Sequence, residues 1–255
     1  MYAEERQQAI ADLVAQRGRL SVNALAAEYA VTTETVRRDL SVLERAGILR
    51  RVHGGAVPAA ALTALEARVG ERDLAHADEK DRIAKRALDL LPASGGSVIL
   101  DAGTTTARLA MMLPRDLQLT VVTNAVPIAG RLAGSPSVDL HLLPGRVRPT
   151  THAAVGEETV EALGRLRADV AFIGTNGLSA THGLSTPDHA EAAAKRAMVA
   201  GAHQVVVLVD SSKIGQEHMV RFADLADIDV VVTDAGIEGA ERAELEAHDV
   251  EVVIA

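Results

Sequence analysis

The sequence predicts a two-domain protein, in which a small N-terminal winged helix-turn-helix domain precedes an α/β domain with a mostly parallel sheet. Residues 21–57 contain two short amphipathic helix patterns joined by a tight turn, which is typical of a helix-turn-helix. From residue 98 onward, apolar runs alternate with helical patterns, as in sheets that helices cover on both faces. At 255 residues, the chain is long enough for one small and one ordinary-sized domain.

The expected boundaries follow from these patterns. Residues 1–57 form the first domain, because a helix over residues 4–17 completes a three-helix unit. Residues 58–74 lack a clear strand pattern and are predicted to be a partly helical linker. The α/β domain then covers residues 75–255 and begins with a strongly periodic helix over residues 78–91.

The second helix of the helix-turn-helix pattern has a clear beginning, apolar face and end. Thr32 stands where its N-cap belongs, as Ser21 does for the first helix, and Gly47 stands where the second helix is expected to stop. Val36, Leu40 and Leu43 recur at i, i+4 and i+7, so they form one buried stripe. In a helix-turn-helix this second helix enters the major groove of DNA.

The outward face of that helix carries groups that read DNA. Arginine can bind both acceptors of a guanine edge, glutamate can accept from cytosine, and threonine hydroxyls suit phosphate oxygens. After Gly47, a strand over residues 48–52, a turn and a return over residues 56–57 predict a small β-wing with two arginines. An ordinary helical hairpin with a solvated charged face is the alternative. The predicted DNA contacts are Thr33, Glu34, Thr35, Arg37, Arg38, Arg50, Arg51 and His53.

Charge and composition narrow the classes of partner. The net charge is −9, divided into +1 over residues 1–57 and −10 over residues 58–255. A near-neutral DNA-binding domain on an acidic body is expected to gain affinity by forming a dimer. Only 2% of the residues are aromatic, which argues against recognition of single strands by base stacking. The chain has no cysteine, no apolar run of about 20 residues and no signal-peptide pattern, so we expect a cytoplasmic protein without membrane contacts.

The larger domain shows seven apolar runs that are typical of buried strands. They cover residues 98–100, 119–122, 138–143, 170–173, 205–209, 230–232 and 250–254. Helical patterns lie between most of them, near residues 105–113, 125–133, 157–166, 188–200 and 239–247.

A ligand site is expected beyond the carboxyl ends of these strands, near a switch in strand order. The loop at residues 101–106 follows the first strand and leads directly into a helix, whose free N–H groups favour an anion. Neither G-x-G-x-x-G nor G-x-x-x-x-G-K-[ST] is present, so a phosphate on a small molecule fits better than a nucleotide. Plain N-capping is the alternative. The predicted ligand residues are Asp101, Gly103, Thr104, Thr105, Thr106, Asn124, Gly145, Gly174, Asn176, Gly177 and Lys213.

No catalytic residue, metal site or cofactor is predicted. The nine histidines show no metal spacing, and no G-x-S-x-G elbow is present. Thr186 is expected to cap the helix near residues 188–200. Glu191 and Lys195, at i and i+4 on that helix, are either a stabilising pair or part of the site.

These motifs, in this order, resemble those of the DeoR family of bacterial transcriptional regulators over nearly the whole chain. The resemblance covers residues 35–40, 51–56, 71–72, 79–80, 101–105, 122–124, 174–177 and 210–213. It implies a repressor of a sugar-catabolic or phosphotransferase operon that binds double-stranded operator DNA. The C-terminal domain would sense a phosphorylated sugar on a fold similar to ribose-5-phosphate isomerase, without catalysis.

Residues 186–198 look most like those of the fructose-operon and related ketose-phosphate regulators, which implies an effector such as fructose 1-phosphate. A homo-oligomer, either a dimer or a tetramer, is expected. The alternative from another class is an active sugar-phosphate isomerase with an appended DNA-binding domain, in which Asp101 or Asp210 would be the base. Activation in place of repression is not distinguished by the residues.

Overall fold

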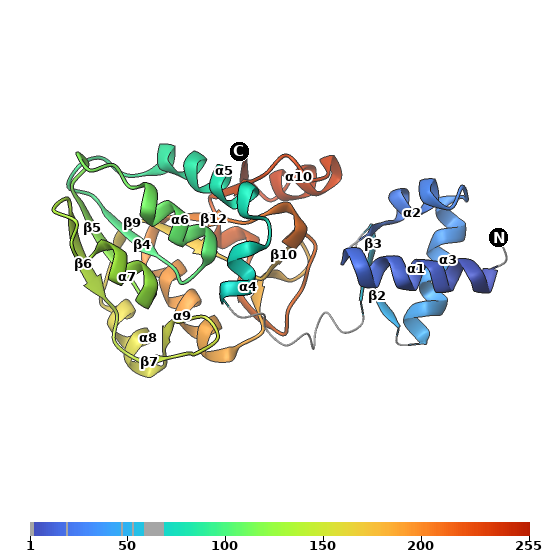
Figure 1. Ribbon diagram of the computed structural model, residues 1–255, viewed down its shortest axis with the longest axis horizontal. Coiled ribbons are helices and arrows are strands. Elements are labelled where there is room, and N and C mark those ends of the chain that lie inside the picture. Colours follow the sequence, from blue (N-terminus) through green and yellow to red (C-terminus); the bar gives the residue numbers. More distant parts are fainter. Residues whose placement is uncertain (1–2, 19, 47, 53, 59–68) are drawn as a thin grey trace. The chain divides into compact units, whose positions relative to one another are not determined.

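The structure is a computed structural model. It describes residues 3–18, 20–46, 48–52, 54–58 and 69–255. The chain divides into two units, Met1–Leu65 and Glu66–Ala255, each of which is described by itself (Figure 1). Among the described residues, no helix is both long and apolar enough to cross a membrane.

The described part of the first unit combines helices with a small antiparallel sheet of order β1-β3-β2. Its elements are α1 (Ala3–Arg17), β1 (Leu20–Ser21), α2 (Val22–Glu28), α3 (Thr33–Arg45), β2 (Leu49–Val52) and β3 (Gly55–Pro58). Strands β2 and β3 form the predicted wing. Strand β1 was not predicted, because a two-residue strand has no periodicity of its own; it pairs Leu20 with Ala56.

The caps and the apolar stripes of the first unit are confirmed. Thr32 Oγ1 accepts from the Thr35 N–H at 3.2 Å, and Ser21 Oγ accepts from the Ala24 N–H at 3.0 Å. The stripe residues of α3 are buried with residues of the other elements: Ile10, Val14, Leu25, Val36, Leu40, Leu43 and Leu49. Gly47, the predicted end of the second helix, lies outside the described residues, and α3 ends at Arg45.

The second unit is built on a seven-stranded sheet of order β15-β14-β12-β9-β4-β5-β6, and every strand pair in it is parallel. The strands are β4 (Ser97–Leu100), β5 (Leu119–Thr123), β6 (Val138–Leu142), β9 (Ala168–Gly174), β12 (Ala202–Leu208), β14 (Val230–Thr233) and β15 (Glu251–Ile254). The helices are α4 (Val69–Leu74), α5 (Ala77–Ala87), α6 (Thr104–Met112), α7 (Val126–Leu132), α8 (Glu157–Gly164), α9 (His189–Ala200) and α10 (Gly239–Glu246).

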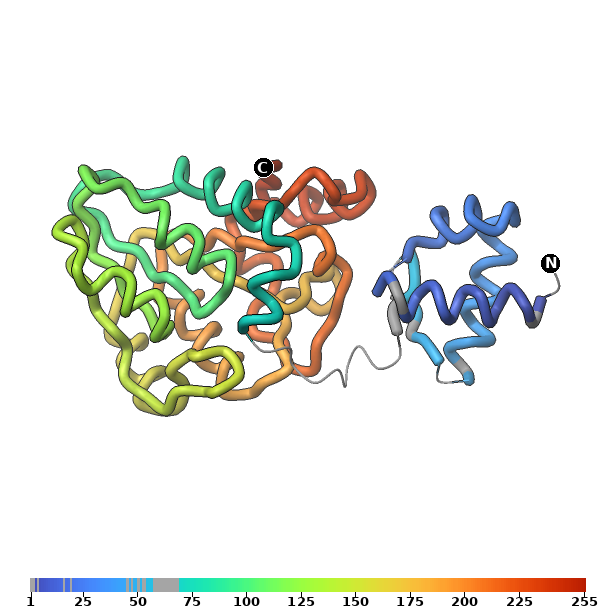
Figure 2. Tube along the Cα trace, viewed as in Figure 1, coloured from blue at the N-terminus to red at the C-terminus, as the bar shows by residue number. Residues whose placement is uncertain are grey.

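Two apolar layers hold the helices against the sheet, whose Cα trace is drawn in Figure 2. On one face, α5, α6 and α7 bury apolar side chains against Val98, Leu100 and Phe172. On the other face, α8, α9 and α10 pack against Ile99 and Ile173. Neighbouring strand residues point to opposite faces, so the continuous apolar runs serve both layers. The predicted mostly parallel α/β sheet is therefore confirmed.

Several short elements were not predicted. An antiparallel sheet contains β10 (Gly177–Ser179), β11 (Gly183–Thr186) and β13 (Val220–Ala223), and a separate ribbon contains β7 (Arg146–Val147) and β8 (Ala154–Val155). Their lengths of two to four residues are too short for a periodic signal.

Two predicted helix ends were wrong. Thr186 is the last residue of β11, and the N-cap of α9 is Asp188, whose Oδ1 accepts from the Glu191 N–H at 2.9 Å. The helix expected over residues 78–91 ends as an α-helix at Ala87 and continues as the 3₁₀ turn η2 (Leu88–Leu90). Leu91 is extended, because the residue before a proline is driven out of the helical region.

The strand order reverses beside β4. Chain order runs from β4 through β5 to β6 on one side, and then returns to β9 on the other side of β4. The carboxyl ends of β4 and β9 thus form the switch point at which ligands bind in open α/β sheets.

Candidate functional site

The first candidate site is the face of α3 opposite its buried stripe. Glu34, Arg37 and Arg38 are exposed there, and Thr33 and Thr35 are half-buried at the N-terminal end of the helix. Arg37 Nη1 lies 3.7 Å from Glu34 Oε2, an exposed pair that can exchange for contacts to a base or a phosphate. The predicted DNA-contacting residues of α3 therefore lie together on an accessible helix face.

The wing is fastened to this helix by polar contacts. Arg51 Nη1 donates to Ser41 Oγ at 2.8 Å, and the Arg51 N–H donates to Glu44 Oε1 at 2.9 Å. The exposed Arg51 guanidinium is thereby placed beside α3. The side chain of Arg50 and the whole of His53, two further predicted contacts, lie outside the described part of the chain.

At the sheet switch point, Asp101 is the centre of a buried polar network. Its side chain is only 2% exposed. Asp101 Oδ2 accepts from the Gly174 N–H at 3.0 Å and forms an ion pair with Lys195 Nζ, which also donates to the Gly174 carbonyl at 2.9 Å. The ammonium group lies 5.5 Å from the ring centre of Phe222, which adds a cation–π contact. This network joins the ends of β4 and β9 to α9.

The following loop is organised around the start of α6. Thr106 Oγ1 donates to the Asp101 carbonyl at 2.6 Å and accepts from the Gly103 N–H at 3.0 Å. Thr104, Thr105 and Thr106 are all buried, and Gly103 is the N-cap residue. The alternative of plain N-capping and an anion site at the helix start are compatible, because a cap leaves other N–H groups of the first turn available to a ligand.

Three buried or half-buried lysines gather near this switch point: Lys80 on α5, Lys195 on α9 and Lys213 in the 3₁₀ turn η3 (Ser211–Lys213). Lys213 Nζ lies 3.3 Å from Asp210 Oδ2. Burial and then the charge of Lys213 lower the pKa of Lys80 to about 8. Burial also lowers the pKa of Lys213, and Lys195 acts in the same direction, although Asp210 opposes it. A set of mutually repelling cations in an acidic domain favours an anionic ligand.

Other predicted ligand residues have structural contacts of their own. Asn124 Nδ2 donates to the Ala154 carbonyl at 3.0 Å, while its buried Oδ1 has no hydrogen-bond partner. Gly145 has a φ of +133°, and a Cβ there would lie 2.3 Å from Thr159 Oγ1. A Cβ on Gly177 would lie 2.4 Å from the Gln216 carbonyl oxygen. Backbone geometry thus requires glycine at positions 145 and 177 whether or not a ligand binds.

Asn176 lies in the same region but contacts the small antiparallel sheet. Its Oδ1 accepts from Thr186 Oγ1 at 3.2 Å, and its N–H donates to the Ser185 carbonyl at 3.2 Å. Gly145 follows β6, two strands away from β4. The structure therefore groups Asp101, Gly103 and Gly174 closely, and Asn176 and Gly145 have contacts elsewhere.

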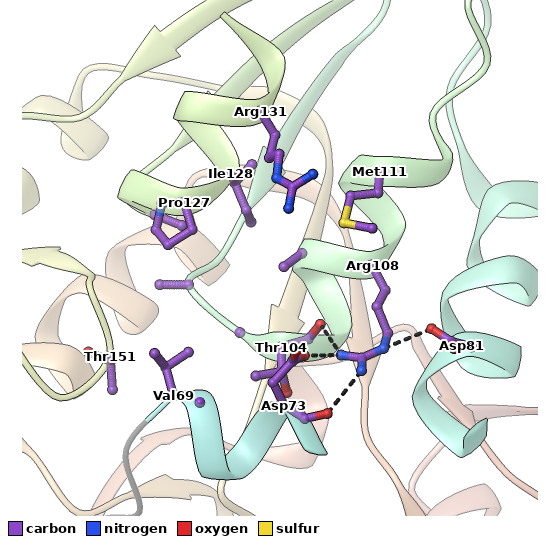
Figure 3. Close-up of a pocket in the computed structure, with 15 residues that line it drawn as sticks. Val69, Asp73, Asp81, Thr104, Arg108, Met111, Pro127, Ile128, Arg131 and Thr151 are labelled. Atoms are coloured by element: carbon purple, nitrogen blue, oxygen red, sulfur yellow. Dashed lines mark hydrogen bonds and ion pairs between the residues drawn. The ribbon is translucent and has the colours of Figure 1, made fainter. Parts of the chain in front are cut away.

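A cavity of about 470 Å³ opens beside the start of α6 (Figure 3). Gly103 and Thr104 line it with Arg131 and with Arg108, which forms ion pairs with two further lining residues, Asp73 and Asp81. Its apolar wall consists of Val69, Ala107, Met111, Pro127 and Ile128. An anion-carrying polar molecule with a partly apolar surface fits such a lining. The three lysines do not line this cavity, but Lys80 contacts the end of α4, which does.

Of the three lysines, Lys80 was missed and Lys195 was left with two alternatives. Lys80 shares the buried face of α5 with Ile83, Ala84 and Ala87, and a lysine on an apolar helix face is a signal that sequence alone offers. Lys195 and Glu191 were expected to be either a stabilising pair or part of the site, and the structure gives each of them a different partner. Lys195 pairs with Asp101, and Glu191 Oε1 lies 2.6 Å from Arg148 Nη1.

Comparison with protein families matches both parts of the chain. Residues 6–60 match the model described as "DeoR-like helix-turn-helix domain", and residues 75–235 match "DeoR C terminal sensor domain".

Individual proteins that are similar to this chain are also named as transcriptional regulators. The HTH-type transcriptional regulator GlpR of Haloferax volcanii is 37% identical, over 99% of this chain and 98% of that protein. The glycerol-3-phosphate regulon repressor of Escherichia coli is 30% identical, over 92% of each chain. Among solved structures, ribose 5-phosphate isomerase A of Methanocaldococcus jannaschii has a TM-score of 0.41 and 20% identity, over 55% of each chain.

Proposed function

The chain belongs to the DeoR family of transcriptional regulators, and we propose that it represses a sugar-catabolic operon until a phosphorylated sugar binds its α/β domain. Residues 1–57 would bind operator DNA, and residues 75–255 would bind the effector. Two similar proteins are named as a transcriptional regulator and a regulon repressor, which supports the regulatory role and disfavours the isomerase alternative.

The observation that carries the effector proposal is the cationic cluster beside the start of α6. Besides burial, the charge of Lys213 lowers the pKa of Lys80, and that of Lys195 lowers the pKa of Lys213, although Asp101 and Asp210 pair with Lys195 and Lys213. A phosphate dianion relieves this repulsion and accepts hydrogen bonds from N–H groups of the first turn of α6. The orphaned Oδ1 of Asn124 would accept from a sugar hydroxyl.

A ketose phosphate such as fructose 1-phosphate is our proposed effector. The likeness of residues 186–198 to ketose-phosphate regulators supports this choice. The cavity beside α6 is large enough for a hexose, and Arg131 in its lining favours an anion.

In the DNA-binding domain, we propose that Arg38 reads a base edge and that Arg37, Arg50, Arg51 and His53 contact the sugar–phosphate backbone. Arg38 is exposed on α3, the helix that enters the major groove in this architecture. Two such domains in one homo-oligomer, a dimer or tetramer formed by residues 75–255, would contact half-sites about 34 Å apart or a multiple of that. A monomer that binds the operator at micromolar concentration would contradict the oligomer.

The isomerase alternative requires a free base near a carbon acid. Asp101 is held by Lys195 and the Gly174 N–H. Although burial opposes ionisation of Asp210, Lys213 and a hydrogen bond from Ser212 keep its pKa below the ordinary value, which makes it a weak base. Turnover of ribose 5-phosphate or fructose 6-phosphate that Asp101→Asn abolishes would revive this alternative.

Fluorescence anisotropy of the protein on the DNA upstream of its own gene tests the proposal. The titrants are fructose 1-phosphate, fructose 1,6-bisphosphate, tagatose 6-phosphate and glycerol 3-phosphate, each with its unphosphorylated parent as the control. We expect release by a phosphorylated ketose and not by the free sugar. Release by none of the four would refute the effector assignment, while DNA binding itself would support the DNA-binding domain.

A further inference from the structure

Helix α4 (Val69–Leu74) is held to the rest of the second unit by polar contacts. None of its residues is buried, so apolar packing contributes little to its attachment. At its start, the Val69 N–H donates to the Thr150 carbonyl at 2.9 Å. An element held in this way can detach without exposing an apolar core.

Arg108 of α6 makes the main attachment at the other end (Figure 3). Its guanidinium forms an ion pair with the Asp73 carboxylate and donates to the Asp73 carbonyl at 2.9 Å. The same side chain lies 2.7 Å from Asp81 Oδ1 on α5 and is only 13% exposed. One arginine thus joins α4, α5 and α6.

Lys80 adds a second cationic attachment. Its Nζ donates to the carbonyls of Arg72 and Ala75, at the C-terminal end of α4. Cations at this end complement the helix dipole and satisfy carbonyls that have no partner within the helix. We use the name α4 latch for these contacts of Arg108 and Lys80 with Asp73, Arg72 and Ala75.

The cation at the centre of the α4 latch, Arg108, also belongs to the proposed ligand region beside α6. Arg108 lines the cavity beside α6, and it also donates to the carbonyl of Thr104, the first residue of α6, at 3.2 Å. Helix α4 lines the same cavity through Val69, Gly70 and Asp73. It is also the first described element after residues 59–68, through which the chain arrives from the first unit.

We propose that the anionic group of a bound sugar phosphate competes with Asp73 for Arg108 and thereby releases α4 from α5 and α6. Because the chain from the DNA-binding domain enters the second unit at α4, this release is the step that changes operator affinity. The inference rests on the proposed function, since it assigns a regulatory role to the same site. Two ligands of one cation oppose each other by linkage, so strengthening one contact weakens the other.

Hydrogen exchange of the full-length protein without any sugar tests the latch by itself. Asp73→Asn removes the anion that binds Arg108, and we expect amide exchange over residues 69–75 to speed up about tenfold or more, as for loss of a charge-assisted contact. Asp81→Asn is the matched control, because Asp81 is equally exposed and contacts the same arginine from α5. Equal exchange of α4 in the wild type and Asp73→Asn would overturn the latch.

Adding fructose 1-phosphate to the wild type tests the competition. We expect slower exchange over residues 101–106 together with faster exchange over residues 69–75. Slower exchange of the loop with unchanged or slower exchange of α4 would overturn the competition for Arg108 and leave the proposed effector site standing. Unchanged exchange of the loop would instead count against the proposed effector, and the sugar-free comparison would still decide the latch.

Operator binding supplies the functional readout. Without sugar, Asp73→Asn is expected to bind the upstream DNA about tenfold more weakly than Asp81→Asn, because loss of the latch mimics the effector. Equal DNA affinity of the two variants would contradict the role of α4 in coupling.

Discussion

The two candidate sites are built in opposite ways. The proposed DNA-binding face of α3 consists of exposed and half-buried side chains from one helix and its wing, within about 20 consecutive residues. The site at the β4–β9 switch point consists of buried groups from Lys80 to Lys213, which the parallel sheet brings together. Side chains on an exposed face can be exchanged at little cost to folding, whereas buried charges depend on their partners.

The largest expected difference between the two regions is in stability. Lys195→Met leaves the buried carboxylate of Asp101 without its cation, and we expect the free energy of unfolding to fall by about 3–5 kcal/mol. Arg37→Met, which removes one partner of the exposed pair on α3, is expected to cost less than about 1 kcal/mol. Urea unfolding followed by far-UV circular dichroism measures both. Similar losses would mean that burial does not distinguish the sites.

The next largest expected effects are on DNA binding by the first unit. Arg38→Ala is expected to weaken operator binding by about 1–3 kcal/mol and to relax sequence preference, as for loss of a bidentate base contact. Arg50→Ala is expected to weaken all sequences alike and to lower the slope of log affinity against log salt by about one unit. Anisotropy titrations on operator and scrambled DNA at several salt concentrations separate the two effects. Equal effects on specificity would contradict this division of roles.

The helix cap of α3 tests whether the regions are energetically separate. Thr32→Ala removes the acceptor of the Thr35 N–H, and we expect the DNA-binding domain to lose about 1 kcal/mol of stability. Hydrogen exchange should speed up in α3 and stay unchanged in the strands of the seven-stranded sheet. Faster exchange in both units would show that they unfold together.

The smallest expected effect is a pH dependence confined to the larger unit. Because the pKa of Lys80 is about 8, its positive charge is present below that pH and is lost as the pH rises through it. The affinity for fructose 1-phosphate should therefore fall about threefold between pH 7 and 9. This change is smaller than the full contribution of one charged contact to binding. Isothermal titration calorimetry measures it, and Lys80→Gln should bind more weakly with a flatter pH profile. A wild-type affinity that rises over this range would contradict a role for the Lys80 charge.

The same contrast explains what could be predicted from the sequence. The caps at Ser21 and Thr32, the stripe of α3 and the wing depend on nearest neighbours along the chain, so their patterns were sufficient. The parallel sheet followed from apolar runs that serve two faces. The ion pair between Asp101 and Lys195 joins residues 94 positions apart, and no local pattern specifies such a partner.

The attachment of α4 also could not be predicted from the sequence. Asp73 lies in the segment predicted to be a linker, and its contact with Arg108 depends on how α4 and α6 pack. Within the α4 latch, Lys80 carried a signal in the sequence, because it stands on the apolar face of α5. Gly145 and Gly177 were predicted to contact the ligand, but close approaches of the backbone are by themselves enough to require glycine at both positions.

The central claim is that a sugar phosphate bound at the switch point releases DNA bound by the other unit. The most direct test compares the wild type and Lys213→Gln by anisotropy on the upstream DNA, titrated with fructose 1-phosphate. We expect equal DNA affinity without sugar and about a tenfold higher sugar concentration for half-release in the variant, as for the loss of one charged contact. Half-release at the same concentration in both proteins, or no release of the wild type, would contradict this claim.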